Sequence, residues 1–409
     1  MGSTRLEVQE RRVKARQPIL GHTPQSKVPG MPVRGTSLHE MLRPYLDHEL
    51  ARYSELELFD AHTHIGRNDP DGFSAEPEEI LAAMDASGQQ RALLFAMQEP
   101  GGEYRAANDE VLRACEASDG RLNALGRVSP LVDGAIAEAT RTLDAGAVGI
   151  KLHPRSDAFT LPNPVVDQIA GLVGERRGIV LFHAGRGIPN LGEAALELAA
   201  KYPGVRIVLA HAGISDLGAI ANAVGDAHNV FFDTAWWQVS DLIALFCEIA
   251  PGQILHASDM PYGTGMFAAW ADLRLAASVG LGEDAVRSIM GGQLARLVAG
   301  KEPLDLGPPP GVEALGPRLP GAERAIAHLT AAVAASFGGS DPTQSLALAR
   351  VACQTPGPDD PSARVLGTVD RFAAAAMDSY EQDEDDIVRY ALSAVAGQIV
   401  AGTPWVDLP

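Results

Sequence analysis

Short apolar runs alternate with longer amphipathic stretches between residues 56 and 300. Some runs, such as Ile179–Phe182 and Ile207–Ala210, are apolar at every position, which is typical of parallel strands covered on both faces. The eight runs are Leu56–His64, Arg91–Met97, Leu122–Val128, Val148–His153, Gly178–His183, Val205–His211, Asn229–Thr234 and Gln253–Asp259.

The stretches between these runs carry helix signals. Pro77 and the two acids after it suit a first helical turn, and the Ala- and Leu-rich stretch Gly192–Tyr202 stops at Pro203-Gly204. Eight strand–helix units predict a distorted (β/α)8 TIM barrel, a fold of about 250 residues. A doubly wound open sheet is the alternative. It normally has a Gly-rich phosphate-binding turn after its first strand, where this chain has His62-Thr63-His64-Ile65-Gly66.

The pattern changes after residue 300. Residues 301–322 are rich in Pro and Gly and predict a linker. Four Ala-rich helices are predicted beyond it, over Ala322–Phe337, Thr343–Ala352, Ala363–Ser379 and Asp385–Val400. The predicted organisation is therefore an N-terminal arm or extension over residues 1–54, a barrel over 55–300, the linker over 301–322 and a helical C-terminal region over 323–409.

Charge excludes some classes of partner. Lys plus Arg number 33 and Asp plus Glu number 52, which gives a formal net charge of −19. Such an acidic chain is poorly suited to nucleic acid or to a polybasic membrane contact. No apolar run reaches the length of a signal peptide core or a membrane span, and the three cysteines lie far apart with no Cys-x-x-Cys. We expect a cytoplasmic protein that acts on a small molecule.

Polar side chains gather where the predicted strands end, and barrel enzymes carry their active sites at that end. Five of the seven are histidines, in a chain that has only 11. They are His62 and His64 on the first run, Lys151 and His153 on the fourth, His183 on the fifth, His211 on the sixth and Asp259 on the eighth.

His62 and His64 are two residues apart on one strand, so both imidazoles face the barrel interior. With a third imidazole from a neighbouring strand and a carboxylate, they form a nitrogen–oxygen site for Zn²⁺ or a related divalent ion. When the protein supplies fewer ligands than the metal can bind, one coordination position is left for water. A zinc ion lowers the pKa of such a water molecule towards ~7. A lone buried histidine is usually structural, but several at the same barrel end predict a metal centre.

Five segments at these strand ends form a recognisable set: Phe59–His64, Gly149–Pro154, Leu181–Gly185, Leu209–Gly213 and Ala257–Pro261. With them, residues 56–300 resemble the amidohydrolase superfamily, in its amidohydrolase-related (amidohydrolase 2) branch. The resemblance implies a distorted (β/α)8 barrel with one or two metal ions, most often Zn²⁺, and a tendency to form homo-oligomers.

The resemblance also implies roles for single residues. His62, His64 and His183 would be metal ligands, and Asp259 would bind metal and act as the general base. His211 would bind a second metal, or orient water or substrate. Lys151 would bridge two metals if carboxylated; otherwise Lys151 or His153 would contact an anionic substrate, or Lys151 would form a structural ion pair.

Three residues near the predicted rim are further candidates for substrate contacts. Arg186 follows His183 closely and can fork a carboxylate. Trp236 follows the seventh run and can wall the pocket, and Tyr262 lies just past Asp259.

Hydrolysis of a small-molecule amide, ester or lactone is the first functional prediction, supported by the run Ser258–Gly263. Non-oxidative decarboxylation of an aromatic or unsaturated acid is the alternative within the same branch. A barrel kept only as a binding scaffold would have lost the ligands, and this chain retains them.

Overall fold

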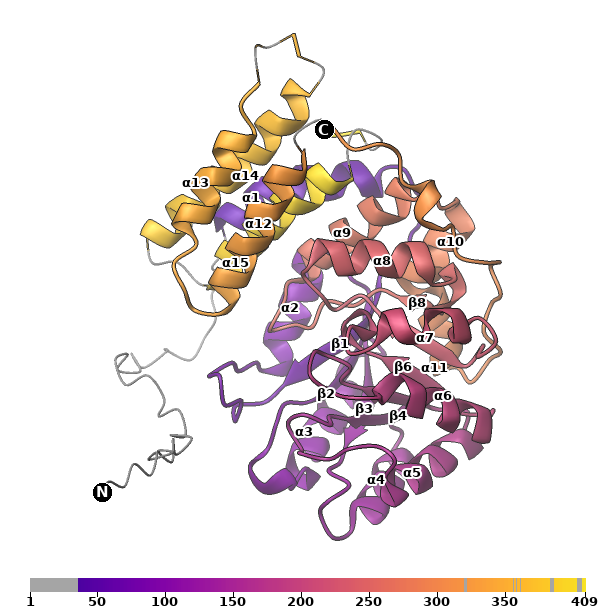
Figure 1. Ribbon diagram of the computed structural model, residues 1–409. Helices are drawn as coiled ribbons and strands as arrows, with labels where there is room; N and C mark the ends of the chain where they lie inside the picture. The colour runs from indigo at the N-terminus through magenta and orange to yellow at the C-terminus, as the bar shows by residue number, and fades with distance from the viewer. Residues whose placement is uncertain are drawn as a thin grey trace, which may run out of the picture. The chain divides into compact units, whose positions relative to one another are not determined.

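The computed structural model describes residues 36–319, 322–355, 357, 359–360, 362–382, 386–402 and 407–409. Eight parallel strands form one sheet in the order β1 to β8 and alternate with helices, which makes the predicted (β/α)8 barrel with extra C-terminal helices the observed fold (Figure 1). The strands are β1 Phe59–Ile65, β2 Arg91–Ala96, β3 Leu122–Arg127, β4 Gly149–Leu152, β5 Ile179–Phe182, β6 Arg206–Leu209, β7 Val230–Asp233 and β8 Ile254–Leu255.

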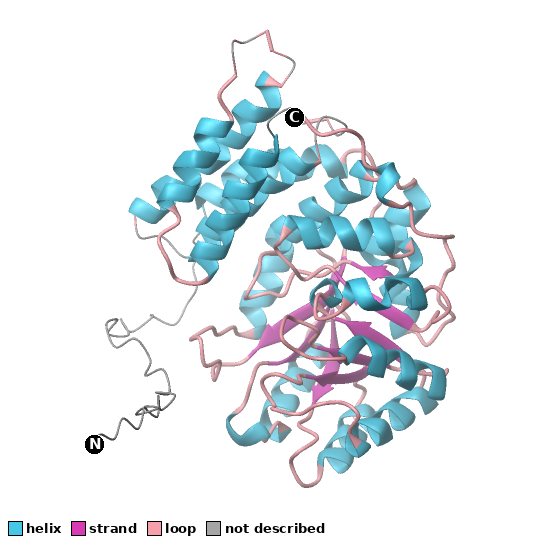
Figure 2. Cartoon of the chain, in the orientation of Figure 1, coloured by secondary structure: helices cyan, strands magenta, loops and turns pink. Residues whose placement is uncertain are grey.

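Helices surround the strands, as the colouring of Figure 2 shows. Those of the barrel region are α2 Pro77–Ser87, α3 Arg105–Glu116, α4 Ala135–Asp144, α5 Pro164–Glu175, α6 Leu191–Lys201, α7 Leu217–Val224, α8 Val239–Glu248, α9 Gly265–Ser278, α10 Glu283–Arg287 and α11 Gln293–Val298. Local chemistry sets several of their ends. Helix α2 begins at the expected Pro77 and ends before Gly88, whose φ of 79° suits a residue without a Cβ. Helix α5 is capped by Asn163, whose side chain accepts the backbone N–H groups of Val165 and Val166.

Apolar side chains fill the barrel interior below the functional end. Phe59, Leu93, Phe95, Leu181 and Phe231 belong to this buried cluster. They alternate along their strands with residues that pack against the surrounding helices, as the pleat requires. The interior is thus a packed core on which polar side chains rest at the carboxyl ends of the strands.

The barrel closes between β1 and the segment that follows β8. The backbone N–H of Ala61 donates to His256 O at 2.8 Å, that of Asp259 to His62 O at 3.0 Å, and that of His64 to Met260 O at 2.8 Å. The regular part of β8 is only two residues long, shorter than the predicted run, because residues 256–260 make these bonds outside a continuous ladder.

Further helices lie on both sides of the barrel in the sequence. They are α1 Thr36–Leu50, α12 Ala322–Phe337, α13 Thr343–Ala352, α14 Ala363–Glu381 and α15 Asp386–Ala401. Helix α1 packs on α9, and α15 contacts α8 and α9. The predicted N-terminal arm lies outside the described residues as far as residue 35, and the proposed domain boundaries stay predictions.

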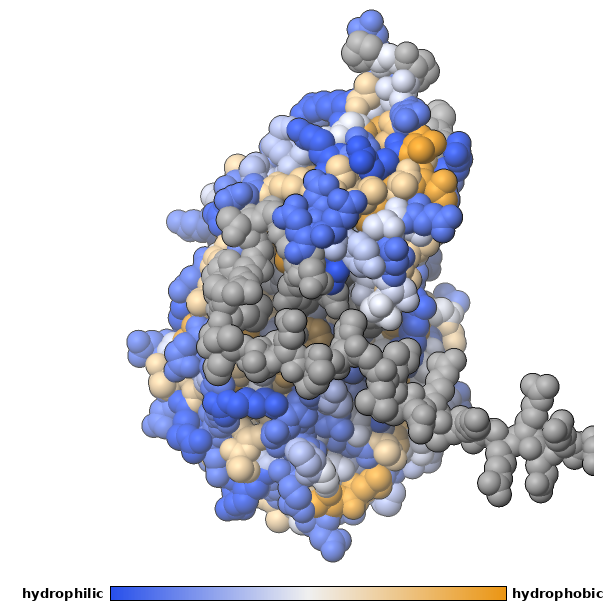
Figure 3. All heavy atoms as spheres, turned by 90° about the vertical axis from the view of Figure 1, so that its left-hand side faces the viewer, coloured by the Kyte–Doolittle hydropathy of each residue, from blue (hydrophilic) through white to orange (hydrophobic). Residues whose placement is uncertain are grey.

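The molecular surface seen in Figure 3 is mostly hydrophilic with small apolar areas. The large apolar side chains exposed among the described residues are Leu131, Leu304, Val312, Leu348 and Val351. In the described part of the chain, no helix combines the length and apolar character needed to cross a bilayer.

Candidate metal centre

Three of the predicted ligands converge at the carboxyl end of the barrel. His62 Nε2 lies 3.1 Å from His64 Nε2, and Asp259 Oδ1 lies 3.2 Å from the first and 3.1 Å from the second. Ligands held tetrahedrally at about 2.0–2.1 Å from a zinc ion are about 3.3 Å apart. The three atoms therefore form a nearly equilateral triangle of the size that a divalent metal ion requires, and among the described residues they form the group suited to one.

The imidazoles of this group are in the state that binds metal. Burial, and then the nearby positive charge of Lys151, lowers the pKa of His62 well below its usual value. Burial also lowers the pKa of His64. Both rings are therefore neutral near pH 7 and can offer a nitrogen lone pair.

Asp233, at the end of β7, holds His62 in orientation. His62 Nδ1 donates to Asp233 Oδ2 at 2.7 Å, which leaves Nε2 as the unprotonated atom that faces His64. The other carboxylate oxygen of Asp233 accepts the backbone N–H groups of His211 at 2.8 Å and Ala235 at 3.1 Å. A carboxylate behind a ligating imidazole is a common way to fix its tautomer.

His211 and His183 form a second group beside the triangle. His211 Nδ1 donates to Ala235 O at 2.6 Å, so its Nε2 accepts a hydrogen bond from His183 Nδ1 at 2.9 Å. His183 Nε2 is then an unprotonated nitrogen, and it is buried without a hydrogen-bond partner in the described part of the chain. His153 stacks on His183 with ring centroids 3.8 Å apart. The structure thus places all the predicted histidines around one centre, and the ligand role of His183 stays a prediction.

The backbone bends where two of these side chains leave their strands. His211 has a φ of 57° and Asp259 a φ of 60°, left-handed values that are uncommon for residues with a Cβ. On β6 the inward-facing residues are Val208 and Ala210, so regular alternation would point residue 211 away from the barrel. The bend brings the imidazole of His211 to 5.1 Å from the ring of His62, measured between centroids.

Lys151 is fully buried beside the triangle. Its Nζ lies 3.3 Å from His62 Nε2 and 4.7 Å from the ring centroid of Phe95. Burial lowers the pKa of this ammonium to about 7, although the carboxylates of Asp233 and Asp259 oppose the change. Burial raises the pKa of Asp259 well above its usual value, and Lys151 opposes that change. Carboxylation of Lys151 stays a prediction.

The three rim candidates have different neighbours, and Tyr262 is the one whose ring contacts a triangle residue. The ring of Tyr262 is edge-on to His64 at 5.2 Å, and its hydroxyl donates to Asp69 Oδ2 at 2.6 Å. Trp236 has its ring centroid 6.0 Å from that of His211. Arg186 is exposed and bonds to Gln238 Oε1 at 2.5 Å and Asp241 Oδ2 at 3.2 Å.

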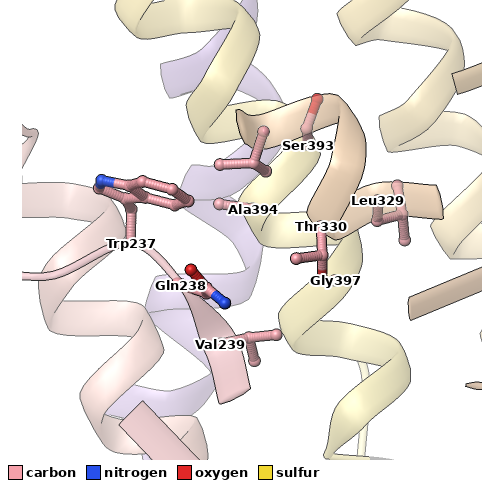
Figure 4. Close-up of a pocket in the computed structure, with 9 residues that line it drawn as sticks. Trp237, Gln238, Val239, Leu329, Thr330, Ser393, Ala394 and Gly397 are labelled. Atoms are coloured by element: carbon pink, nitrogen blue, oxygen red, sulfur yellow. The ribbon is translucent and has the colours of Figure 1, made fainter. Parts of the chain in front are cut away.

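The loop after β7 joins this rim to the C-terminal helices. Trp236 stacks on Trp237 with centroids 5.0 Å apart. Trp237 in turn lines a small pocket with residues of α8, α12 and α15, among them Val239, Leu329 and Gly397 (Figure 4). The C-terminal helices therefore support one wall of the candidate site.

Sequence reasoning missed two cationic residues as well as Asp233. Arg127, at the end of β3, pairs in register with Lys151 and is buried, with Nη1 donating to Ala96 O at 3.1 Å and Nη2 to Ser156 Oγ at 2.7 Å. Arg155 follows β4 and is exposed, and its charge is a minor cause, far behind burial, of the lowered pKa values of His183 and His211. The signal that could have revealed Arg127 and Asp233 is their inward position at a strand end, the criterion that identified the histidines.

Comparison with known proteins identifies a family for the barrel region. The family model described as Amidohydrolase matches residues 59–297. No curated protein shows significant sequence similarity to the chain.

Similar solved structures include 5-carboxyvanillate decarboxylase from Sphingomonas paucimobilis, with 17% identity, coverage of 60% of this chain and 99% of that one, and a TM-score of 0.46. A 2,6-dihydroxybenzoate decarboxylase shares 17% identity, with coverage of 60% of this chain and 99% of that one and a TM-score of 0.47. A probable 2-pyrone-4,6-dicarboxylic acid hydrolase from Acinetobacter baumannii shares 14% identity, with coverage of 60% of this chain and 100% of that one and a TM-score of 0.44. Their names include both decarboxylases and a hydrolase.

Proposed function

The chain belongs to the amidohydrolase family, and from this premise we propose that it is a metal-dependent hydrolase of a small-molecule amide, ester or lactone. The observation that carries the proposal is the triangle of His62, His64 and Asp259, with atoms 3.1–3.2 Å apart. His62 and His64 would hold the ion together with Asp259, and His183 offers a further unprotonated nitrogen nearby.

The ion in this proposal is Zn²⁺, because two imidazoles and a carboxylate suit it. When bound, it acts as a Lewis acid and makes water a better nucleophile near neutral pH. Asp259 is the general base, since its Oδ1 belongs to the triangle and its Oδ2 lies 4.0 Å from His211 Nδ1. It takes the proton of the attacking water and delivers it to the leaving group.

The substrate in this proposal carries a carboxylate. Lys151 and Arg127 are buried at the functional end, and Arg155 is an exposed guanidinium whose charge acts on His183 and His211. Cations in these positions stabilise a bound carboxylate through charge-assisted hydrogen bonds. Lys151 or His153 would contact the carboxylate nearest the metal, and Arg186, Trp236 and Tyr262 would contact the distal part.

Decarboxylation is the second candidate, because the same buried cation beside the triangle can hold a carboxylate that is to be lost. The two reactions differ in their products. Hydrolysis consumes water and releases an acid, whereas decarboxylation releases carbon dioxide from a substrate with one carbon more than the product.

Elemental analysis and a substrate panel test the proposal. Gently purified protein should hold close to one equivalent or more of divalent metal and hydrolyse some carboxylated lactones, esters or amides. Arg176→Gln, at an exposed ion pair with Asp144, is a control that keeps activity. Release of carbon dioxide from aromatic acids, without hydrolysis, would favour the second candidate, and protein that neither holds nor takes up metal would refute both.

A further inference from the structure

The seam that closes the barrel holds two of the three triangle residues on different segments. His62 lies on β1 and Asp259 beyond β8. The pairing of β1 with β2 shifts register between Asp60 and Thr63, which is a bulge at the ligand-bearing part of the strand. The irregular ladder at this point leaves the separation of His62 and Asp259 to local bonds, of which the backbone bond from Asp259 N–H to His62 O at 3.0 Å is one.

Asp60 supplies such bonds from one carboxylate oxygen. Its Oδ1 accepts the backbone N–H of His62 at 2.9 Å and that of Ser258 at 3.0 Å. The first donor is the amide of a ligand residue itself, and the second belongs to the residue before Asp259. One fully buried atom thus joins the two ligand-bearing segments across the seam.

The other carboxylate oxygen of Asp60 belongs to a network of hydrogen bonds between buried side chains. Gln89 Nε2 donates to Asp60 Oδ2 at 2.8 Å and lies 3.2 Å from His256 Nε2. His256 Nδ1 lies 2.7 Å from Asp272 Oδ2, which also accepts the hydroxyl of Thr234 at 2.7 Å. The Thr234 hydroxyl oxygen accepts the backbone N–H of Ala257 at 2.9 Å, so the chain returns to the segment that carries Asp259.

We propose that Asp60 is a positioning residue that sets the distance between the His62 and Asp259 ligand atoms, and that Gln89 holds Asp60 in place. The inference rests on the proposed metal centre. It assigns Asp60 no contact with substrate or with reacting atoms. Its effect acts through the backbone of the two segments, so it should alter how well the triangle fits an ion as well as how stable the barrel is.

Titration of the metal-free protein with Co²⁺ tests this, because visible absorption of bound Co²⁺ reports both affinity and coordination geometry without any substrate. Asp60→Asn, which weakens both Oδ contacts, should raise the Kd for Co²⁺ about tenfold or more and change the absorption spectrum. Gln89→Met leaves the Asp60 carboxylate in place and removes the Gln89 contacts to Asp60, His256 and Ser87. It should therefore give a smaller change in the same direction, and it serves if Asp60→Asn fails to fold.

Gln293→Leu is the matched control. Gln293 is also buried and joins two backbone segments, accepting from Leu304 N and donating to Gly252 O, which precedes β8 whereas Asp259 follows it. It should lower Tm without changing the Co²⁺ affinity or spectrum.

Two results are decisive. If Gln89→Met and any folded Asp60→Asn protein lose only Tm and keep the wild-type Co²⁺ affinity and spectrum, the positioning role is refuted while the metal centre stands. The wild-type protein should give a Co²⁺ spectrum that is absent from His62→Ala. If it does not, the proposed metal centre, and with it the proposed function, is refuted.

Discussion

His62 Nδ1 donates to Asp233 Oδ2 across 2.7 Å, with both side chains buried. Asp233→Asn should keep the shape but offer His62 a different partner, so the imidazole can adopt the wrong tautomer and its Nε2 can carry the proton. We expect metal affinity to fall about 10- to 100-fold, which is typical when the hydrogen-bond partner of a metal-binding histidine is replaced. Competition with a chromophoric chelator measures it, and unchanged affinity would show that Asp233 serves only the barrel.

The paired change His62→Ala and His64→Ala removes two corners of the triangle. Metal content should fall to background and catalytic activity should disappear, while circular dichroism keeps its wild-type shape, because the apolar core below the site is untouched. Retention of a full equivalent of metal by this variant would place the ion elsewhere.

We expect Lys151 to lower the free energy of unfolding of the metal-free protein. Its folded-state pKa of about 7 lies below the ordinary 10.5, so the folded state binds its proton less readily than the unfolded state does. The cost is therefore full below about pH 7 and shrinks as the pH rises towards 10.5. Lys151→Met should raise the free energy of unfolding on the order of 1–3 kcal/mol at pH 7, and by less at pH 9.5. Chemical denaturation at both pH values measures it, and destabilisation at pH 7 would contradict the argument.

Much of this site could be predicted from strand ends alone. The apolar runs located the barrel strands, and parallel strands bring their carboxyl ends together, so His62, His64 and Asp259 were expected to meet and do. The backbone turns at His211 and Asp259 could not be predicted, since neither residue is a glycine. Asp233 lies inward at a strand end, which could have marked it as a site residue, but its bond to His62, 171 residues away, could not be predicted. Asp60 was not identified because its partner Ser258 is 198 residues away, and a single carboxylate on a strand gives no local pattern that marks such a bond.

Asp241 holds the Trp236 wall of the candidate site. Its Oδ2 accepts from the indole Nε1 at 2.8 Å and from Arg186 at 3.2 Å. Asp241→Ala removes both bonds without touching the triangle, so KM should rise roughly fivefold, the effect of about 1 kcal/mol, with kcat nearly unchanged. Steady-state kinetics on any substrate found in the panel checks this. A loss confined to kcat would mean that the wall acts on the chemical step.

Gly397 offers a way to stabilise the junction between α15 and the barrel. A Cβ added there would lie 3.8 Å from Val239 Cγ1 and 3.9 Å from Leu329 Cβ, which are ordinary contacts beside the pocket that Trp237 lines. Gly397→Ala should therefore raise the free energy of unfolding by about 0.5–1 kcal/mol, because alanine restricts the unfolded chain and favours helix. At Gly402 the same Cβ would come within 2.7 Å of Ser278 Oγ, so Gly402→Ala should not stabilise. Thermal unfolding of both variants checks the pair. Because Gly402 also lies beyond the end of α15 at Ala401, an equal gain from both variants would contradict the close approach of Gly402 to Ser278.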